Sequence, residues 1–383
     1  MLKKICILAN KYPNNVEPTT NMFIQQLAWQ FADMGYECFV ICPMPTNFNK
    51  KYKKLEEVSE ESTENGNKVK VYRPKYKSLG QSGSFFQKTR VRLTTKFYED
   101  VTFKTLKRYS LNPDIVYSYF ICPTSVVAAH ITKKLGIPSF MEHGEALYSA
   151  DKKYGNKYLK KQFEYLTGCI AVSNQNRDYL INNDVLDKDK ILVQPNCFRE
   201  ERFYKIDKKE ARKHFGWDED KFIVGYCGSL DERKGALRVE KAVDKLDNVY
   251  MAFAGGGKLV PTSKKVIYCK PVLHSDLIYF YNALDVFVLP TTAEGSCTAT
   301  AEAIGCGCPI ISSKRSFNDN LCDDTNSILV GPMDIDQISS SIELLYNDIT
   351  KLNELSNGSL KKRESLKQKE RMNKVVEFIE SKI

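Results

Sequence analysis

The feature that most constrains the fold is a series of short runs that are almost continuously apolar. A strand with one wet face alternates apolar and polar residues, whereas a parallel strand covered on both faces is apolar throughout. Stretches with helical spacing separate the runs, so we predict doubly wound α/β sheets of parallel strands. The runs are residues 5–9, 38–42, 115–117, 139–141, 170–172, 222–226, 251–254, 286–289 and 309–311.

The length of 383 residues predicts two domains. The strand and helix pattern restarts after Gln194-Pro195-Asn196. We therefore predict a first domain over residues 1–195 and a second over residues 196–365. The Lys- and Glu-rich stretch from 360 onward predicts a surface helix, of which residues 366–383 could return to the first domain. Residues 50–68 are polar and predict a solvated loop.

The formal charge is unevenly distributed. Residues 1–195 hold 29 Lys and Arg against 19 Asp and Glu, which accounts for the whole excess of +10. An anionic substrate, an anionic membrane surface or a nucleic acid would each suit such a domain. The basic, aromatic stretch 85–108 predicts one amphipathic helix with a charged outer face, and membrane contact is the functional alternative.

Targeting and cysteine patterns favour a cytoplasmic protein, with peripheral attachment to the membrane as an alternative. No run reaches the roughly 18–20 apolar residues of a membrane span, and no cleavage site follows the first apolar run. The twelve cysteines are scattered through apolar segments, which predicts free buried thiols. Cys306 and Cys308 have no second pair at zinc spacing, so we expect no metal there.

The strongest candidate site follows the apolar run 286–289. Glu294 and Gly295 form a short loop, and a helix is expected to start near Ser296–Thr298, with Ser and Thr as capping residues. A helix N-terminus beyond a strand end offers free N–H groups to a phosphate. Glu302 would lie further along that helix, and two carboxylates there could accept hydrogen bonds from sugar hydroxyls. A turn glycine and a surface glutamate are the structural alternative.

A second candidate loop follows the run 222–226. Gly228 lets the backbone approach a ligand closely, and Arg233-Lys234 supplies two cations for a pyrophosphate. Solvated basic residues are the structural alternative. A glycine cluster at residues 255–257 could line the same crevice or merely turn the chain.

Together these segments resemble glycosyltransferase family 4. The two glutamates are separated by seven residues, as in the Glu-x7-Glu motif of that family, and the flanking segments 283–290 and 302–311 are also similar to it. The segments 194–196 and 272–277 resemble its usual segments too. The resemblance implies the GT-B fold, with two Rossmann-like domains facing a central cleft.

The resemblance also implies an activity. It predicts retaining transfer of a sugar from a UDP- or GDP-sugar, with no metal or other cofactor and no nucleic-acid partner. Glu302 would hold the ribose. Glu294, a candidate catalytic residue, and the backbone of Gly295, Ser296, Cys297 and Thr298 would face the donor sugar. Lys234 would contact the donor phosphates.

Two departures from the family concern the phosphates and the acceptor. Ser229 stands where the family commonly has an arginine after Gly228. We expect Arg233 to replace part of that charge by bending back over Gly228. The N-terminal glycine-rich loop is replaced by Asn10-Lys11-Tyr12-Pro13, which resembles a subset of the family that serves cell-surface polysaccharides.

Among the four histidines, His143 is the candidate catalytic residue. It follows the run 139–141 and resembles the His-Gly segment of the family, where a histidine can hydrogen-bond the donor sugar. A turn histidine is the structural alternative. His274 is expected to be structural, ahead of a capping Ser275. Asp334 and Asp336 form an Asp-x-Asp pair, but Asp before a helix is a good N-cap, so a metal site is not expected there.

The sequence therefore predicts a metal-independent hexosyltransferase of capsule, lipopolysaccharide or related surface-polysaccharide synthesis. The acceptor would be a glycan, expected to be lipid-linked, bound by the basic first domain. Two alternatives stay open. A sugar-nucleotide epimerase can share the fold, and a non-catalytic sugar-nucleotide-binding or membrane scaffold protein could keep the binding residues.

Overall fold

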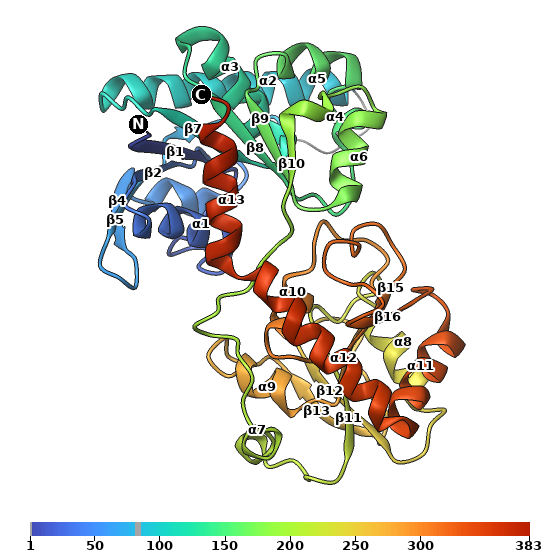
Figure 1. Cartoon of the computed structure of the whole chain (residues 1–383). Coiled ribbons are helices and arrows are strands. Elements are labelled where there is room, and N and C mark those ends of the chain that lie inside the picture. Colours follow the sequence, from blue (N-terminus) through green and yellow to red (C-terminus); the bar gives the residue numbers. More distant parts are fainter. Residues whose placement is uncertain (1, 81–85) are drawn as a thin grey trace. The chain divides into compact units, whose positions relative to one another are not determined.

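Both predicted sheets are present, one in each of two units of a computed structural model that describes residues 2–80 and 86–383 (Figure 1). The first unit comprises Met1–Val172, Asn176–Val193 and Val375–Ile383, and the second comprises Ser173–Gln175 and Gln194–Lys374. The chain therefore enters the second unit for good at Gln194 and rejoins the first at Val375. Each unit is a Rossmann-like α/β layer structure, which is the predicted fold class.

The sheet of the first unit has the strand order β10-β9-β8-β7-β1-β2-β5-β4. Its pairings are parallel except for β4, which runs antiparallel to β5 at the edge. The order reverses between β1 and β7. The strands are β1 Lys4–Leu8, β2 Glu37–Ile41, β4 Val58–Ser62, β5 Lys68–Tyr72, β7 Ile115–Tyr119, β8 Ser139–His143, β9 Gly168–Ala171 and β10 Ile191–Val193; β3 Met44–Pro45 and β6 Lys75–Tyr76 form a separate short ladder.

Helices cover this sheet as the periodicity predicts. The helix α1 (Met22–Asp33) buries the predicted apolar face, including Ile24, Leu27 and Phe31. The basic stretch forms α2 (Gln87–Arg108), while Phe85 lies outside the described residues. The remaining helices are α3 Val126–Leu135, α4 Ala150–Lys153, α5 Asn156–Phe163 and α6 Asn174–Asn182.

The loop predicted over residues 50–68 is wrong. That segment contains a short 3-10 helix, Lys50–Lys54, and the edge strand β4. Side chains from the helix α1 help to fix this strand. The Glu61 carboxylate accepts hydrogen bonds from Gln25 Nε2 at 2.8 Å and Trp29 Nε1 at 2.9 Å. A polar edge strand stabilised by distant side chains lacks the apolar pattern by which strands are recognised.

The second unit has a six-stranded parallel sheet in the order β13-β12-β11-β14-β15-β16. The order reverses between β11 and β14, the switch point of a doubly wound fold. The strands are β11 Phe222–Cys227, β12 Val249–Ala254, β13 Val266–Lys270, β14 Val286–Leu289, β15 Ile310–Ser313 and β16 Ser327–Val330. The helices are α7 Lys208–Phe215, α8 Ala236–Val243, α9 Leu277–Ala283, α10 Thr298–Gly305, α11 Ile335–Asn347 and α12 Ile349–Lys362.

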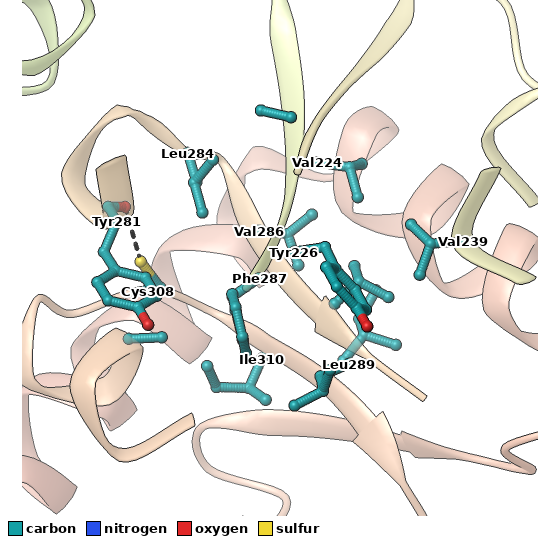
Figure 2. Close-up of a cluster of buried hydrophobic side chains, with 14 of the residues drawn as sticks. Val224, Tyr226, Val239, Tyr281, Leu284, Val286, Phe287, Leu289, Cys308 and Ile310 are labelled. Carbon is teal, nitrogen blue, oxygen red and sulfur yellow. Dashed lines mark hydrogen bonds between the residues drawn. The ribbon is translucent and has the colours of Figure 1, made fainter. Parts of the chain in front are cut away.

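The core of this unit fixes the positions of β11 and β14. Figure 2 shows Val224 and Tyr226 of β11 near Val286 and Leu289 of β14, among side chains that are fully buried. A Cβ added at Gly225 would lie 2.0 Å from a methyl carbon of Leu284, so only glycine allows this approach. The two strand ends that carry the candidate loops are thus anchored side by side in a close-packed interior.

The C-terminal helix expected over residues 366–383 is present and its end belongs to the first unit, but it is not continuous from residue 360 and it is partly buried. The helix α12 ends at Lys362, a 3-10 turn (Arg363–Leu366) follows, and α13 (Gln368–Glu380) begins anew. Val375 and Ile379 of α13 are fully buried in the first unit, and the Phe378 ring lies 6.2 Å from the Phe140 ring on β8. None of the helices in the described part of the chain combines the length and hydrophobicity needed to span a bilayer.

Candidate functional site

The two candidate loops of the second unit leave from adjacent strand ends. The first follows β11 and the second follows β14, on either side of the point where the strand order reverses. Ligands of doubly wound sheets bind at such a point, beyond the carboxyl ends of the strands. The fold therefore brings together segments that are about sixty residues apart in the sequence, from Arg233 to Glu294.

The loop after β11 is shaped by its own polar groups. Gly228 has a φ of +149°, and the Lys234 side-chain carbons lie 3.7 and 3.8 Å from the position of an added Cβ. Asp231 organises the turn, because its carboxylate accepts from Ser229 Oγ at 2.6 Å and from the Lys234 N–H at 2.8 Å. The Ser229 hydroxyl, which occupies the family arginine position, is thus used within the loop.

Both cations of this loop meet Glu294. Lys234 Nζ lies 2.7 Å from Glu294 Oε1, and the Arg233 guanidinium donates to the same oxygen and to the Ala293 carbonyl. The expectation that Arg233 bends back over Gly228 is wrong: the Lys234 stem lies there, and Arg233 reaches toward the carboxylate opposite. Burial disfavours the charged form of Lys234, but Cys297 and Glu294 outweigh it and raise the Lys234 pKa.

The start of α10 differs from the predicted cap. The helix begins at Thr298, and Cys297 is the N-cap residue but makes no capping hydrogen bond through its side chain. Ser296 and Thr298, the expected capping residues, hydrogen-bond Asn196 instead. In the described residues no side chain therefore caps the first turn, which leaves its N–H groups and positive potential at the switch point.

Glu302 is buried on α10. Tyr281 OH donates to Glu302 Oε2 at 2.9 Å, and His274 Nε2 lies 3.9 Å from Glu302 Oε1. Burial raises the pKa of Glu302 to about 7, although the Tyr281 hydrogen bond acts in the opposite direction. His274 thus lies beside a predicted ribose ligand, and the N-cap of α9 is Asp276 rather than Ser275.

The glycine cluster after β12 supports the loop that follows β11. A Cβ at Gly255 would lie 1.9 Å from the Gly228 carbonyl oxygen, and one at Gly257 would lie 2.3 Å from the Leu230 oxygen. The Gly228 and Leu230 N–H groups donate to the Ala254 and Gly256 carbonyls, both at 3.0 Å. The cluster thus lets two backbones pack directly against each other.

His143 lies at the carboxyl end of β8 in the first unit, where its side chain is fully buried. Its Nδ1 hydrogen-bonds the Glu145 carboxylate, and its Nε2 lies 3.4 Å from Asn176 Nδ2. Burial opposes the charge of Glu145, but His143 and the Ile121 N–H, at 2.7 Å, lower the Glu145 pKa on balance. The predictions included neither Glu145, which is only two residues from His143 in the sequence, nor Asn176, which the fold brings to the ring.

Glu145 also lines a cavity of about 370 Å³ in the first unit. The cavity is built from residues that follow β1, β7 and β8, on both sides of the point where this sheet reverses its order. Its walls include the apolar Phe120, Ile121 and Leu147 beside the polar Asn10 and Lys153. Apolar walls with a few polar groups are typical of sites that bind small molecules.

Sequence models of two families match nearly the whole chain. The model of Glycosyltransferase Family 4 matches residues 20–202, and that of Glycosyl transferases group 1 matches residues 207–362. This chain belongs to glycosyltransferase family 4. Both sheets and both candidate loops agree with membership of this family. The chain is therefore a glycosyltransferase.

Relatives and solved structures agree with this membership. TuaC of Bacillus subtilis, assigned by name to teichuronic acid biosynthesis as a glycosyltransferase, is 26% identical over 88% of each chain. CapM of Staphylococcus aureus, named as a capsular polysaccharide biosynthesis glycosyltransferase, is 25% identical over 51% of this chain and 57% of its own. Anabaena HepE with UDP and glucose shares the fold at a TM-score of 0.70, with 16% identity over 100% of both chains.

Proposed function

We propose that this glycosyltransferase moves a sugar, with retention of configuration, from a nucleoside diphosphate sugar to a glycan acceptor in cell-surface polysaccharide synthesis. The observation that carries the proposal is the group at the switch point of the second unit. Lys234 and Arg233 converge there on Glu294, beside the uncapped start of α10 and the buried Glu302. The names of TuaC and CapM support the polysaccharide, and the UDP complex of HepE supports the nucleotide.

The chemistry required is stabilisation of the leaving diphosphate. Positive groups aimed at developing charge in a water-poor site are among the largest contributions to catalysis. Lys234, Arg233 and the N–H groups of α10 would supply that charge, and Glu302 would accept hydrogen bonds from the ribose. Because these positive groups would neutralise the negative charge of the phosphates, we propose that no metal is required.

The acceptor half of the reaction is assigned to the cavity of the first unit. We propose that the His143–Glu145 pair binds the reacting sugar, with Glu145 lining the cavity and the fully buried His143 hydrogen-bonded behind it. Holding a reactant in the attacking geometry removes much of the entropic barrier to transfer. The basic charge of residues 1–195 suits an acceptor that carries anionic groups, such as a diphosphate-linked lipid glycan.

The first prediction concerns the donor. Purified protein incubated with a panel of UDP- and GDP-sugars should release nucleoside diphosphate only when membrane extract supplies an acceptor, and release should survive a chelator. Retention is checked by NMR of the anomeric bond formed. Epimerisation without an acceptor would support the epimerase alternative, and binding without release would support the scaffold. Loss of activity on chelation, restored by Mg²⁺ or Mn²⁺, would overturn metal independence.

The second prediction concerns attachment to an anionic membrane, which we propose for the outer face of α2. Phe86, Leu93 and Phe97 are exposed on or beside this helix, with exposed Lys104 and Lys107 among its basic residues. Binding to anionic vesicles should fall sharply at high salt, because screening shortens to about 3 Å near 1 M.

Two paired variants locate that attachment. Lys104→Glu/Lys107→Glu should lower vesicle binding, whereas Lys258→Glu/Lys264→Glu in the second unit makes the same charge change and should leave it unaltered. All four lysines are exposed. Equal binding to neutral and anionic vesicles, or equal effects of the two variants, would contradict attachment through α2.

A further inference from the structure

The loop that follows β1 is joined to the edge strand β4 at two points. Ser59 and Glu61 lie on the same face of β4, since side chains alternate between the two faces of a strand. The Glu61 carboxylate accepts a hydrogen bond from the hydroxyl of Tyr12. Ser59 Oγ accepts from Arg73 Nη1 at 2.5 Å, and Arg73 Nη2 donates to the Pro13 carbonyl at 3.2 Å. The strand therefore holds two successive residues of the loop, one directly and one through Arg73.

These contacts are buried, and each donor meets an acceptor of suitable charge. Tyr12 is fully buried and Arg73 is 7% exposed. Burial and the charge of Glu61 raise the pKa of the Tyr12 hydroxyl, so this hydroxyl remains a donor. An ionised carboxylate can only accept, and Glu61 also receives N–H groups from Gln25 and Trp29. Three neutral donors thus converge on one carboxylate, which is a stronger acceptor than a neutral oxygen.

The loop held in this way forms part of the cavity wall in the first unit. Asn10, at the start of the loop, lines the cavity of about 370 Å³ whose lining also includes Glu145. Immediately before Asn10, the Ala9 carbonyl accepts from the buried Tyr98 hydroxyl at 2.9 Å. The chain is therefore held on both sides of Asn10, at Ala9 and at Tyr12. A residue between two such points has a narrow range of positions.

We propose that Glu61 is a positioning residue for the acceptor, because it acts through Tyr12 to keep Asn10 in the wall of the cavity. The inference rests on the proposed function, since it assumes that the acceptor binds in this cavity. The Asn10 amide can donate to a sugar hydroxyl. Releasing the loop would move that amide and weaken acceptor binding, whereas the donor site belongs to the second unit and would be unaffected. The polar sequence of β4 thereby gains a role in the reaction.

The test measures sugar transfer from the preferred labelled nucleotide sugar to increasing amounts of membrane extract, which supplies the acceptor. Tyr12→Phe and Glu61→Ala should each raise the amount of extract that gives half-maximal rate about threefold to tenfold. The maximal rate and the calorimetric affinity for the nucleoside diphosphate should stay nearly unchanged. Glu60→Ala is the matched control, because Glu60 lies on the opposite face of β4, 3.7 Å from Lys68, and both side chains are exposed.

Two further measurements examine the route through Tyr12. In a Tyr12→Phe protein, Glu61→Ala should add less than about twofold to the acceptor effect, because the two residues act as a unit. Trypsin should cleave after the exposed Lys11 faster in the Tyr12→Phe protein than in the wild type, since the loop is released. Should Glu61→Ala fail to fold, Tyr12→Phe, which removes a single oxygen atom, supplies the transfer and cleavage measurements by itself.

The outcomes separate the inference from its foundation. If the wild-type protein transfers no sugar to any component of the extract, the proposed function fails and the inference fails with it. If transfer occurs and Tyr12→Phe leaves the half-maximal amount of extract unchanged, the inference alone is overturned. Faster cleavage after Lys11 without an acceptor effect would then assign these contacts to the stability of the loop. Equal effects of Glu61→Ala and Glu60→Ala would also overturn the inference.

Discussion

If Glu302 holds the ribose as we propose, nucleotide affinity should depend on pH. Its carboxyl group is buried against Tyr281, and burial raises its pKa to about 7. The ionised form accepts hydrogen bonds from two ribose hydroxyls, whereas the protonated form has one oxygen that donates instead. Ionisation therefore increases through neutral pH, and with it the capacity of the residue to hold a ribose.

The third prediction follows from that ionisation. Affinity for the preferred nucleoside diphosphate should fall about tenfold between pH 8 and pH 6, since the ionised fraction of a group with a pKa near 7 falls by that factor. Calorimetry at the two pH values measures it. Glu302→Gln should bind more weakly at pH 8 and lose most of the pH dependence. The terminal phosphate also titrates in this range, so an equal pH slope in both proteins would assign the effect to it.

The sequence predicted single residues unevenly. Glu294, Lys234 and Glu302 could be proposed because their spacing matches a family motif, and the fold places them at one switch point. Asn176 could not, because its contact with His143 depends on how β8 and α6 approach each other, and nothing in the local pattern marked Glu145 as the partner of that ring. The contact between Arg233 and Glu294 was missed for a related reason. That contact depends on the position of the Glu294 carboxylate, which lies on the loop after a different strand.

At the scale of elements, the glycines after β12 determine how closely two loops approach. Gly255 lies against the Gly228 carbonyl, whereas a Cβ at Gly256 would make only ordinary contact, 3.8 Å from Pro271. The two neighbouring glycines have the same chemistry but very different surroundings. They therefore form a matched pair for substitution.

The fourth prediction uses this pair. Gly255→Ala should push the Gly228 loop away, lower the melting temperature by several degrees and weaken nucleotide binding, because an overpacked backbone contact costs about 1–3 kcal/mol. Gly256→Ala should leave both properties nearly unchanged. Thermal unfolding measures the melting temperature of the two variants, and calorimetry measures their nucleotide affinity. Similar behaviour of the two would mean that the loop after β11 adjusts freely.

The elements themselves were predictable where burial dominates. The continuous apolar runs predicted β1, β2, β7, β8 and the inner strands of the second unit. A short run of this kind is typical of a strand that is covered on both faces. The edge strand β4 and the strands β5 and β13, by contrast, alternate or carry polar residues, and tertiary contacts decide their pairing. Patterning alone does not reveal such contacts.

At the scale of the whole molecule, the final residues complete the first unit. Val375 and Ile379 are fully buried there, and a Cβ added at Gly168 on β9 would lie 2.9 Å from Phe378. The two tryptophans of the chain report on different units: Trp29 belongs to α1 of the first, and Trp217 packs with Phe215 and Phe280 in the second.

The fifth prediction uses these reporters. In a Trp217→Phe protein, the fluorescence of Trp29 follows the unfolding of the first unit in urea. Deleting residues 375–383 should lower the midpoint of that transition, because each buried apolar side chain contributes about 1.5–3 kcal/mol to stability. The midpoint followed by Trp217, in a Trp29→Phe protein, should stay in place. Deleting only residues 381–383, which are exposed, is the control and should change neither midpoint. Equal losses at both tryptophans would show that the two units unfold as one.

The return of the chain at Val375 also bears on how the protein is made. Ribosomes deliver a polypeptide from its N-terminus, and a leading domain ordinarily folds before the next has emerged. Here the residues that complete the first unit, 375–383, are synthesised after every residue of the second unit. Throughout that interval the patch around Phe140 and Gly168 is uncovered on the nascent chain. Binding by a holdase chaperone would protect this patch until translation has passed residue 383.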